Sequence, residues 1–199
     1  MNQPDFNNKL ITIIGLHETG KSYFAKRLSR KYENVVFDIL GEYDTKKNDV
    51  WLPDNDQFPE VQKEFDTFLK YTREQKQKGN ADWDMVILDE ASTVLPNKKS
   101  LDTHINNFLN YYRHPVEEKG WDMGGVFIAR RPARLNTNVV ELSRYIVVFR
   151  VTGKNDVKYL NGISSGLGDE ASKLGQGDRP DHEFILVNPD RSFQLMNPL

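Results

Sequence analysis

The segment from Gly15 to Ser22 constrains the fold of this chain more than any other feature. It reads Gly-Leu-His-Glu-Thr-Gly-Lys-Ser and matches G-x-x-x-x-G-K-[ST], the Walker A pattern, at every fixed position. The preceding run, Leu10–Ile14, is almost entirely apolar, which is typical of a strand buried on both faces, and a helix is expected from about Lys21 to Lys31. Strand, loop and helix in this order predict a loop whose backbone N–H groups wrap a phosphate chain.

Individual positions of this loop can be given roles because the pattern fixes their chemistry. Lys21 is expected to reach the β- and γ-phosphates of ATP, and the Ser22 hydroxyl is expected to bind Mg²⁺. His17 and Glu18 fill variable positions, so we expect exposed side chains there rather than catalytic ones. The positions expected to bind the nucleotide are Gly15, Leu16, His17, Glu18, Thr19, Gly20, Lys21 and Ser22.

Strand-length apolar runs alternate with helical patterns along the rest of the chain. This alternation predicts an α/β fold of the P-loop NTPase type, with a mostly parallel central sheet flanked by helices. Further strands are expected at 35–37, 85–88, 126–129 and 145–149, and helices at 60–78, around 105–112 and at 135–143, with a surface loop at 44–58. We expect one domain over 1–199, with a core at about 9–155, a flexible glycine-rich loop at 161–182 and a C-terminal hairpin at 183–199.

Adjacent carboxylates follow another strand-like run, Met85–Leu88. Asp89, at the carboxyl end of this strand, is expected to hold Mg²⁺ beside the phosphate loop. Glu90 is expected to orient and deprotonate a water in line with the γ-phosphate. Because a kinase takes its nucleophile from the acceptor and needs no water-activating base, this pair of acids favours hydrolysis.

Composition narrows the function classes further. Lys and Arg number 27 and Asp and Glu 29, a net charge of −2, which argues against a generally basic nucleic-acid-binding surface but is compatible with a local patch. The candidates for such a patch are Lys98, Lys99, Arg130, Arg131 and Arg134. The chain has no cysteine, which excludes disulfides, thiolate zinc sites and cysteine nucleophiles and fits a cytoplasmic protein. Its apolar runs are of strand length, so no membrane insertion is expected.

Three further segments make the chain resemble the FtsK–HerA superfamily of ring-forming, DNA-translocating ATPases. Asp38–Tyr43 is similar to the D-x-x-G-E-Y of HerA-like members, Tyr112–His114 to a G-R-H element, and Ile128–Pro132 to the A-T-Q-R-P strand end. The resemblance implies that Arg113 supplies an arginine to the nucleotide of a neighbouring subunit. It places Arg130 where the superfamily has a polar sensor glutamine. The match covers about residues 10–155, and the small size of the chain looks most like the genome-packaging ATPases of tailless and membrane-containing viruses.

This resemblance implies Mg²⁺-dependent ATP hydrolysis that drives translocation of double-stranded DNA, most typically in viral genome packaging. The residues given catalytic roles are Lys21, Glu90, Arg113 and Arg130. A homo-oligomeric ring is also expected on size, because a globule of this length has a radius of gyration of about 16 Å and cannot enclose a duplex alone. For a viral protein the location would be the host cytoplasm, and a portal, capsid or membrane protein could recruit it.

Other functions fit parts of the same sequence. A small phosphotransferase of the nucleotide-kinase type fits the chain length and the glycine-rich stretch 161–182, which would serve as a lid. A HerA-like motor for DNA segregation or conjugation would carry the same motor residues as a packaging enzyme. A nucleotide-switched assembly protein with negligible turnover is a third alternative. Subunit stoichiometry in the presence of ATP and DNA, and phosphate release without a small acceptor, distinguish these hypotheses.

Overall fold

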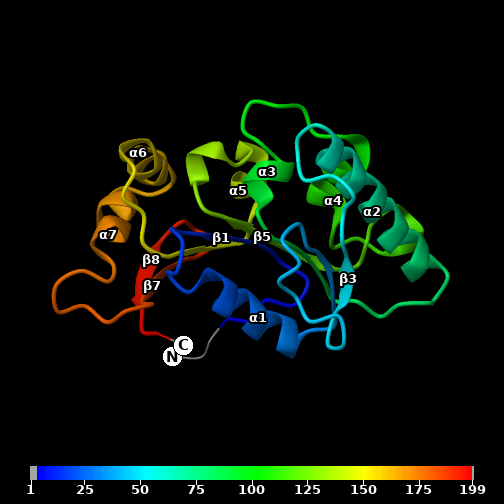
Figure 1. Cartoon of the computed structure of the whole chain (residues 1–199), viewed down its shortest axis with the longest axis horizontal. Helices are drawn as coiled ribbons and strands as arrows, with labels where there is room; N and C mark the ends of the chain where they lie inside the picture. The colour runs from blue at the N-terminus through cyan, green and yellow to red at the C-terminus, as the bar shows by residue number, and fades with distance from the viewer. Residues whose placement is uncertain (1–3, 199) are drawn as a thin grey trace.

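Parallel strands build most of an eight-stranded sheet in the computed structural model, which describes residues 4–198 (Figure 1). The strand order is β3-β2-β4-β5-β1-β6-β7-β8, and each pairing from β3 to β6 is parallel. The last two strands form a hairpin, and β7 runs antiparallel to β6 and to β8. The strands are β1 (Leu10–Ile14), β2 (Asn34–Phe37), β3 (Asp49–Trp51), β4 (Met85–Leu88), β5 (Gly124–Ala129), β6 (Tyr145–Val148), β7 (Phe184–Val187) and β8 (Phe193–Met196).

Helices cover both faces of this sheet unequally. One face is covered by α1 (Lys21–Lys31), which lies below the sheet in Figure 1, and helices α2 to α7 lie above it. The upper helices are α2 (Glu60–Gln77), α3 (Ala91–Val94), α4 (Thr103–Tyr111), α5 (Thr137–Leu142), α6 (Lys154–Ile163) and α7 (Leu167–Lys173), with 3-10 turns η1 (Val116–Glu118) and η2 (Pro132–Arg134).

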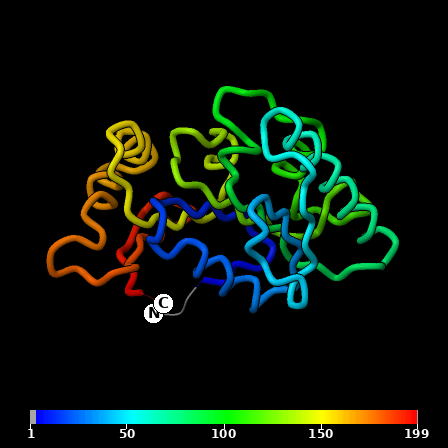
Figure 2. Tube along the Cα trace, viewed as in Figure 1, coloured from blue at the N-terminus to red at the C-terminus, as the bar shows by residue number. Residues whose placement is uncertain are grey.

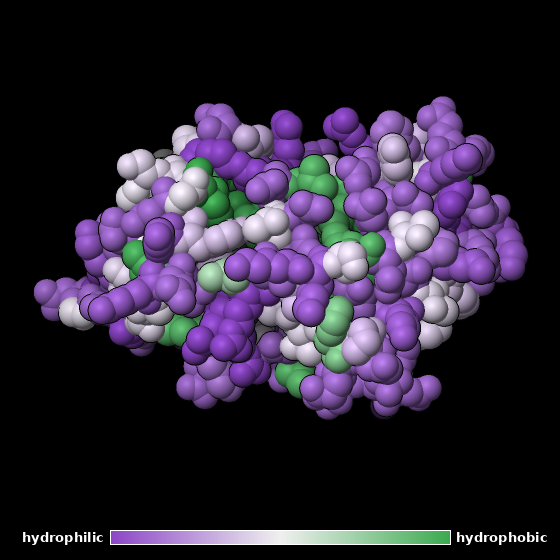
Figure 3. Space-filling view, turned by 90° about the horizontal axis from the view of Figure 1, so that it is seen from above, coloured by the Kyte–Doolittle hydropathy of each residue, from purple (hydrophilic) through white to green (hydrophobic). Residues whose placement is uncertain are grey.

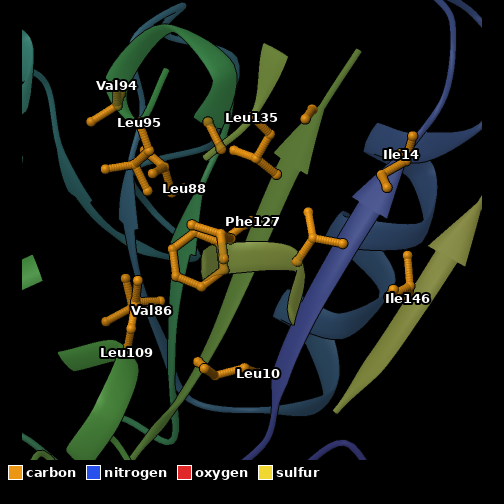
Figure 4. Close-up of a cluster of buried hydrophobic side chains, with 14 of the residues drawn as sticks. Leu10, Ile14, Val86, Leu88, Val94, Leu95, Leu109, Phe127, Leu135 and Ile146 are labelled. Atoms are coloured by element: carbon orange, nitrogen blue, oxygen red, sulfur yellow. The ribbon is translucent and has the colours of Figure 1, made fainter. Parts of the chain in front are cut away.

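Side chains alternate between the two faces along each strand, as the two-residue period of a strand requires. Along β1, Ile11 and Ile13 pack in the cluster of Phe24 of α1, whereas Leu10 and Ile14 belong to the core under the upper helices. Figure 4 shows this second core, where Leu88 of β4 lies near Val94 and Leu95, and Val86 of the same strand lies near Leu109. Burial on both faces explains why the first strand is apolar at nearly every position.

The strand order decides which residues meet at the edge of the sheet. Because β5 lies between β1 and β4 and all of them run parallel, their carboxyl ends share one edge. The residues just beyond β1, β4, β5 and β6 are Gly15, Asp89, Arg130 and Phe149. The phosphate loop, the two acids and the sensor position are therefore brought together by topology, although they are far apart in the sequence.

The structure confirms the predicted fold class, a mostly parallel sheet flanked by helices with a C-terminal hairpin. The strands at 10–14 and 85–88 and the helix at 21–31 have the predicted bounds. One difference lies inside the predicted surface loop 44–58, where β3 forms an edge strand of three residues, pairing Val50 with Val36. A strand this short has too few residues for an alternating pattern to show.

The prediction of a flexible loop over residues 161–182 is wrong for the part that α6 and α7 occupy. Residues 164–166 and 174–183 lack helix or strand, and residues 174–183 are traced in orange in Figure 2 beyond α7. One glycine of the stretch serves packing: a Cβ added to Gly168 would lie 2.1 Å from the carbonyl oxygen of Val157, so a side chain would prevent α7 from approaching α6. Gly166 adopts a φ of 80° where α7 begins, a conformation that glycine adopts without strain.

Seen from above, the molecule is covered mostly by hydrophilic residues, and hydrophobic residues reach the surface in small groups (Figure 3). Within residues 4–198, no helix combines the length and the apolar character needed to cross a membrane. The exposed large hydrophobic side chains belong to different elements; they are Tyr23, Leu40, Leu52, Tyr71, Tyr111, Leu142 and Leu195.

Candidate nucleotide-binding and hydrolysis site

The phosphate loop is held in shape by the two strands that flank β1. The backbone N–H of Gly15 donates to the carbonyl of Ala129 at the end of β5 (3.2 Å), and that of Leu16 donates to the carbonyl of Arg150 just after β6 (2.9 Å). Gly15 has a φ of 154°, and a Cβ added there would lie 2.6 Å from the Cβ of Phe149. The first glycine of the motif is thus required by close packing as well as by backbone conformation.

Lys21 lies inside this loop rather than in solvent. Its residue is only 8% exposed, and its Nζ donates to the carbonyl of Leu16 at 2.6 Å. Burial lowers the pKa of Lys21, and the nearby carboxylates of Asp89 and Glu90 oppose that shift. The ammonium is therefore poised at the centre of the loop, where the phosphates of a bound nucleotide would neutralise it.

The other loop side chains surround this centre. Thr19 Oγ1 donates to the carbonyl of Leu16 (2.8 Å), Ser22 is half-buried at the first turn of α1, and His17 and Glu18 are exposed. Gly20 closes the loop with a φ of 109° at the start of α1. The loop backbone, the Ser22 hydroxyl and the Lys21 ammonium are the groups of this segment that can bind a phosphate chain and a cation.

Asp89 is a buried carboxylate at the end of β4. Only 5% of the residue is exposed, and one carboxylate oxygen, Oδ1, accepts a hydrogen bond from the backbone N–H of Glu90 (2.8 Å). Burial raises the pKa of Asp89 to about 6, and the carboxylates of Glu90, Glu42 and Asp38 add to the rise. A buried acid among other acids fits a cation site, because a divalent ion would offset both the burial and the repulsion.

The donor set fits Mg²⁺ in particular. Within the described residues, no group of three or more His, Asp or Glu side chains is arranged as a complete metal cage. Mg²⁺ is usually bound by one or two protein oxygens together with substrate phosphates and waters, so Asp89 and the Ser22 hydroxyl suffice as protein ligands. When bound, the ion would supply positive charge to the phosphate oxygens.

Glu90 is fixed both by its backbone and by an ion pair. Its φ of 50° and ψ of 39° place it in the left-handed region at the start of α3. Its Oε1 accepts a hydrogen bond from Arg130 Nε at 2.7 Å, and the two side chains are 19% and 49% exposed, respectively. A charge-assisted hydrogen bond of this length orients the Glu90 carboxylate beside the phosphate loop.

The segment 38–43 is built around Asp38, a buried residue whose function the sequence alone did not reveal. The Asp38 carboxylate accepts hydrogen bonds from the backbone N–H groups of Leu40 (3.2 Å), Gly41 (2.9 Å) and Tyr43 (2.9 Å). The turn leaves Glu42 exposed, and its negative charge opposes the lowering of the Lys21 pKa that burial causes. The D-x-x-G-E-Y pattern is thus a carboxylate-centred turn facing the candidate site.

Arg113 lies far from these groups in its own chain. It follows α4, where residues 112–123 lead to the amino end of β5: Met123 N donates to Tyr112 O (3.1 Å) and Gly124 N to Asp84 O (2.7 Å). The phosphate loop is at the carboxyl end of the same sheet, and a strand as long as β5 spans about 17 Å. Arg113 therefore lies away from the phosphate loop of its own chain.

The basic candidates lie on neighbouring segments, which we call the basic strip. Asn97 N donates to Arg134 O (2.7 Å), and the side chain of Asn136 donates to Lys99 O (3.0 Å), so the segments 97–99 and 133–136 lie side by side. The exposed cations on these and the adjoining residues are Lys98, Lys99, Arg130, Arg131 and Arg134. Sequence reasoning found these residues but could not show that they are neighbours.

The sheet order and the loop geometry define the fold of a P-loop ATPase. Neither a protein-family model nor a curated protein matches this chain. Among solved structures it is similar to B204, the DNA-packaging ATPase from Sulfolobus turreted icosahedral virus, with 16% identity, a TM-score of 0.77 and coverage of 98% of this chain and 100% of that one. It is also similar to the genome packaging NTPase B204 from Sulfolobus turreted icosahedral virus 2 in complex with ATP-gammaS, with 18% identity, a TM-score of 0.73 and coverage of 96% and 97%.

A further similarity extends to longer motor proteins. The pCW3 conjugation coupling protein TcpA with ATPgS shares 14% identity and a TM-score of 0.56, and the match covers 98% of this chain and 60% of that one. These likenesses confirm that the chain has the fold expected from its resemblance to FtsK–HerA ATPases. The match to B204 is nearly end to end, so the two chains share the whole architecture, including the C-terminal part that the sequence motifs do not reach.

We expect Asp89→Asn to stabilise the nucleotide-free protein at neutral and higher pH. Asn keeps the acceptor for Glu90 N but carries no charge. Because the pKa of Asp89 is raised from 3.8 to about 6, the folded protein binds this proton more tightly than the unfolded chain, so stability falls as pH rises through that interval. The gain on substitution should be about 1–3 kcal/mol at pH 8 and vanish below about pH 4.

Urea unfolding in EDTA, repeated across this pH range, measures the difference. Asp84→Asn, at the other end of β4, is the matched control. A gain for Asp89→Asn that does not depend on pH would contradict the assigned cause.

Proposed function

We propose that this chain is a Mg²⁺-dependent ATPase that assembles as a homo-oligomeric ring and translocates double-stranded DNA, in viral genome packaging. The observation that carries the proposal is the joint position of Lys21, Asp89 and the Arg130-bound Glu90 at one edge of the sheet. The near-complete overlap with the packaging ATPase B204 supports the same conclusion.

In the proposed reaction, each side chain has one task. The loop N–H groups and Lys21 bind the phosphates of ATP, while Ser22 and Asp89 would hold Mg²⁺. Glu90 orients a water in line with the γ-phosphate and accepts its proton. Arg130 holds the Glu90 carboxylate in place through the 2.7 Å hydrogen bond and adds positive charge near the transferring group.

The position of Arg113 supports the proposed ring. Arg113 lies at the edge of the sheet opposite the phosphate loop of its own chain, so within one chain it does not reach the proposed site. A neighbour that supplies Arg113 completes the site, and hydrolysis then depends on the contact between subunits. The strip of Lys98, Lys99, Arg131 and Arg134 would contact DNA phosphates, which gives binding that is insensitive to sequence and weakened by salt.

One support of the kinase alternative is weakened. In the stretch that would act as a lid, residues 161–163 and 167–173 are helical, and α7 packs on α6 through Gly168. The similarity to the conjugation coupling protein TcpA instead favours the other alternative, a DNA motor outside packaging. The two motor functions share the same chemistry and differ in the partner, a portal, capsid or membrane protein, that would recruit the ring.

ATP hydrolysis by the purified protein, with and without linear double-stranded DNA, tests the proposed function. We expect DNA to stimulate turnover several-fold, and stimulation to fall as salt is raised, because contacts to phosphates release counterions. Glu90→Gln serves as the blank, since it retains the shape and loses the base. Lys99→Glu should reduce the stimulation, while Lys70→Glu on α2 should not.

Turnover that ignores DNA, or that appears only with a nucleoside monophosphate acceptor, would contradict the motor and favour the kinase. Normal hydrolysis by Glu90→Gln would show that Glu90 is not the base.

We expect Arg130→Gln to lower kcat by about 10- to 100-fold while leaving the affinity for ATP nearly unchanged. The substitution removes the hydrogen bond that orients Glu90 and the positive charge beside the γ-phosphate position, which are contributions to the transition state. Steady-state kinetics and nucleotide titration separate the two effects. Arg131→Gln, the adjacent exposed arginine, is the matched control, and equal losses in both variants would contradict the assignment.

We expect Arg113→Ala to abolish turnover without weakening nucleotide binding. Mixing it with Glu90→Gln should restore activity, because a Glu90→Gln subunit supplies its intact Arg113 to a site that has an intact Glu90. With random assembly at equal amounts, about a quarter of the sites have this composition, so about a quarter of wild-type activity should return. Lys119→Ala, on the same segment, should behave as wild type, and absence of any restoration would contradict an arginine supplied in trans.

A further inference from the structure

The two sides of the phosphate loop are chemically different. On one side of β1, strands β5 and β4 bring Arg130, Asp89 and Glu90 to the loop. On the other side, β6 and β7 bring Phe149 and the segment that ends at Glu183. A phosphate chain that crosses the loop with its reactive end at the acids must have its other end on the β6 side.

We infer that a nucleobase binds on the β6 side, stacked between Tyr23 and His182; the inference rests on the proposed function and deepens it. A cavity of about 240 Å³ lies there, lined by Gly20, Tyr23, Phe149, His182 and Pro198. Gly20, the last glycine of the phosphate loop, forms part of its wall. The cavity is therefore continuous with the place where the phosphates would bind.

The aromatic residues of this cavity leave their faces available. Tyr23 is 55% exposed on the first turn of α1, and it forms no ring-to-ring contact with an aromatic residue in the described part of the chain. Phe149, by contrast, is 2% exposed and packs on Phe24 and Phe184. The cavity wall thus combines one open tyrosine ring with a fixed apolar phenylalanine, a surface suited to the π-face of a base.

An unusual backbone conformation places His182 beside Gly20. Its φ of 64° is left-handed, and a Cβ added to Gly20 would lie 3.5 Å from both its Cβ and its Nδ1. The loop 174–183 thus turns back to place this ring at the end of the phosphate loop. On the other side of His182 lies a smaller hollow of about 180 Å³, which Arg150 also lines.

Arg150 supplies a second indication of a ligand beside the loop. Its backbone carbonyl accepts from Leu16 N, and its Nε is buried without a hydrogen-bond partner among residues 4–198. A guanidinium so close to the loop suits the phosphate or ribose oxygens that would connect the base to the phosphate chain. The two hollows share His182 as a lining residue, and loop residues line both of them.

The chemistry of the cavity also defines the substrate class. Its side chains offer ring faces and apolar surface, and among residues 4–198 the polar side-chain groups that line it are the Tyr23 hydroxyl and the His182 ring. Stacking depends little on which base is present, whereas discrimination needs hydrogen bonds to the base edge. The site should therefore accept purine and pyrimidine nucleoside triphosphates with similar affinity.

Calorimetric titration with the β,γ-methylene analogues of ATP and CTP, and with inorganic triphosphate, tests this inference. Tyr23→Ala should weaken both nucleotides by about 5- to 150-fold, the range that loss of base stacking produces, and leave inorganic triphosphate unchanged. Tyr23→Phe should bind as wild type, because the ring face remains. Tyr111→Ala, which removes a similarly exposed tyrosine from α4, is the matched control.

The outcomes separate the base site from the proposed function. Unchanged nucleotide affinity in Tyr23→Ala, or an equal loss for nucleotide and inorganic triphosphate in a variant with normal thermal stability, overturns the base site. A 100-fold preference of the wild-type protein for ATP over CTP overturns the stated substrate class. Failure of the wild-type protein to bind either nucleotide or inorganic triphosphate would instead refute the proposed ATPase.

Discussion

The attachment of the phosphate loop to its two neighbouring strands is the interaction on which the candidate site depends. Two backbone hydrogen bonds, from Gly15 to Ala129 and from Leu16 to Arg150, tie the loop to the ends of β5 and β6. Arg130 follows β5 on one side of the loop, and Phe149 follows β6 on the other side. Because the phosphate loop, Arg130 and Phe149 share one edge of the sheet, a change in strand order would separate them.

The placement of β5 between β1 and β4 has a chemical reason. It sets the phosphate loop and the Asp89-Glu90 pair one strand apart, and the intervening strand end carries Arg130, whose side chain bridges to Glu90. If β4 lay directly beside β1, no strand end between the loop and the acids would carry a cation that could bind Glu90. The sheet thus places the two acids, Arg130 and Lys21 next to one another along one edge.

Much of this could be predicted from the sequence because the deciding signals are local. The loop pattern, the apolar run before it and the Asp89-Glu90 strand end each occupy a few consecutive residues, and their elements have the predicted bounds. The contact of His182 with Gly20 joins segments far apart in the chain, so no local pattern reveals it. The helices within 161–182 escape prediction for another reason, since a glycine used for close helix packing, such as Gly168, looks the same in sequence as one used for mobility.

The left-handed backbone of Glu90 links the stability of the molecule to its chemistry. A non-glycine residue in this conformation costs on the order of 1 kcal/mol, and here the cost falls on the residue whose carboxylate faces the loop. Glycine would relieve that strain and remove the carboxylate in the same step. Under the proposed function, a substitution that relaxes this turn would therefore also remove the general base.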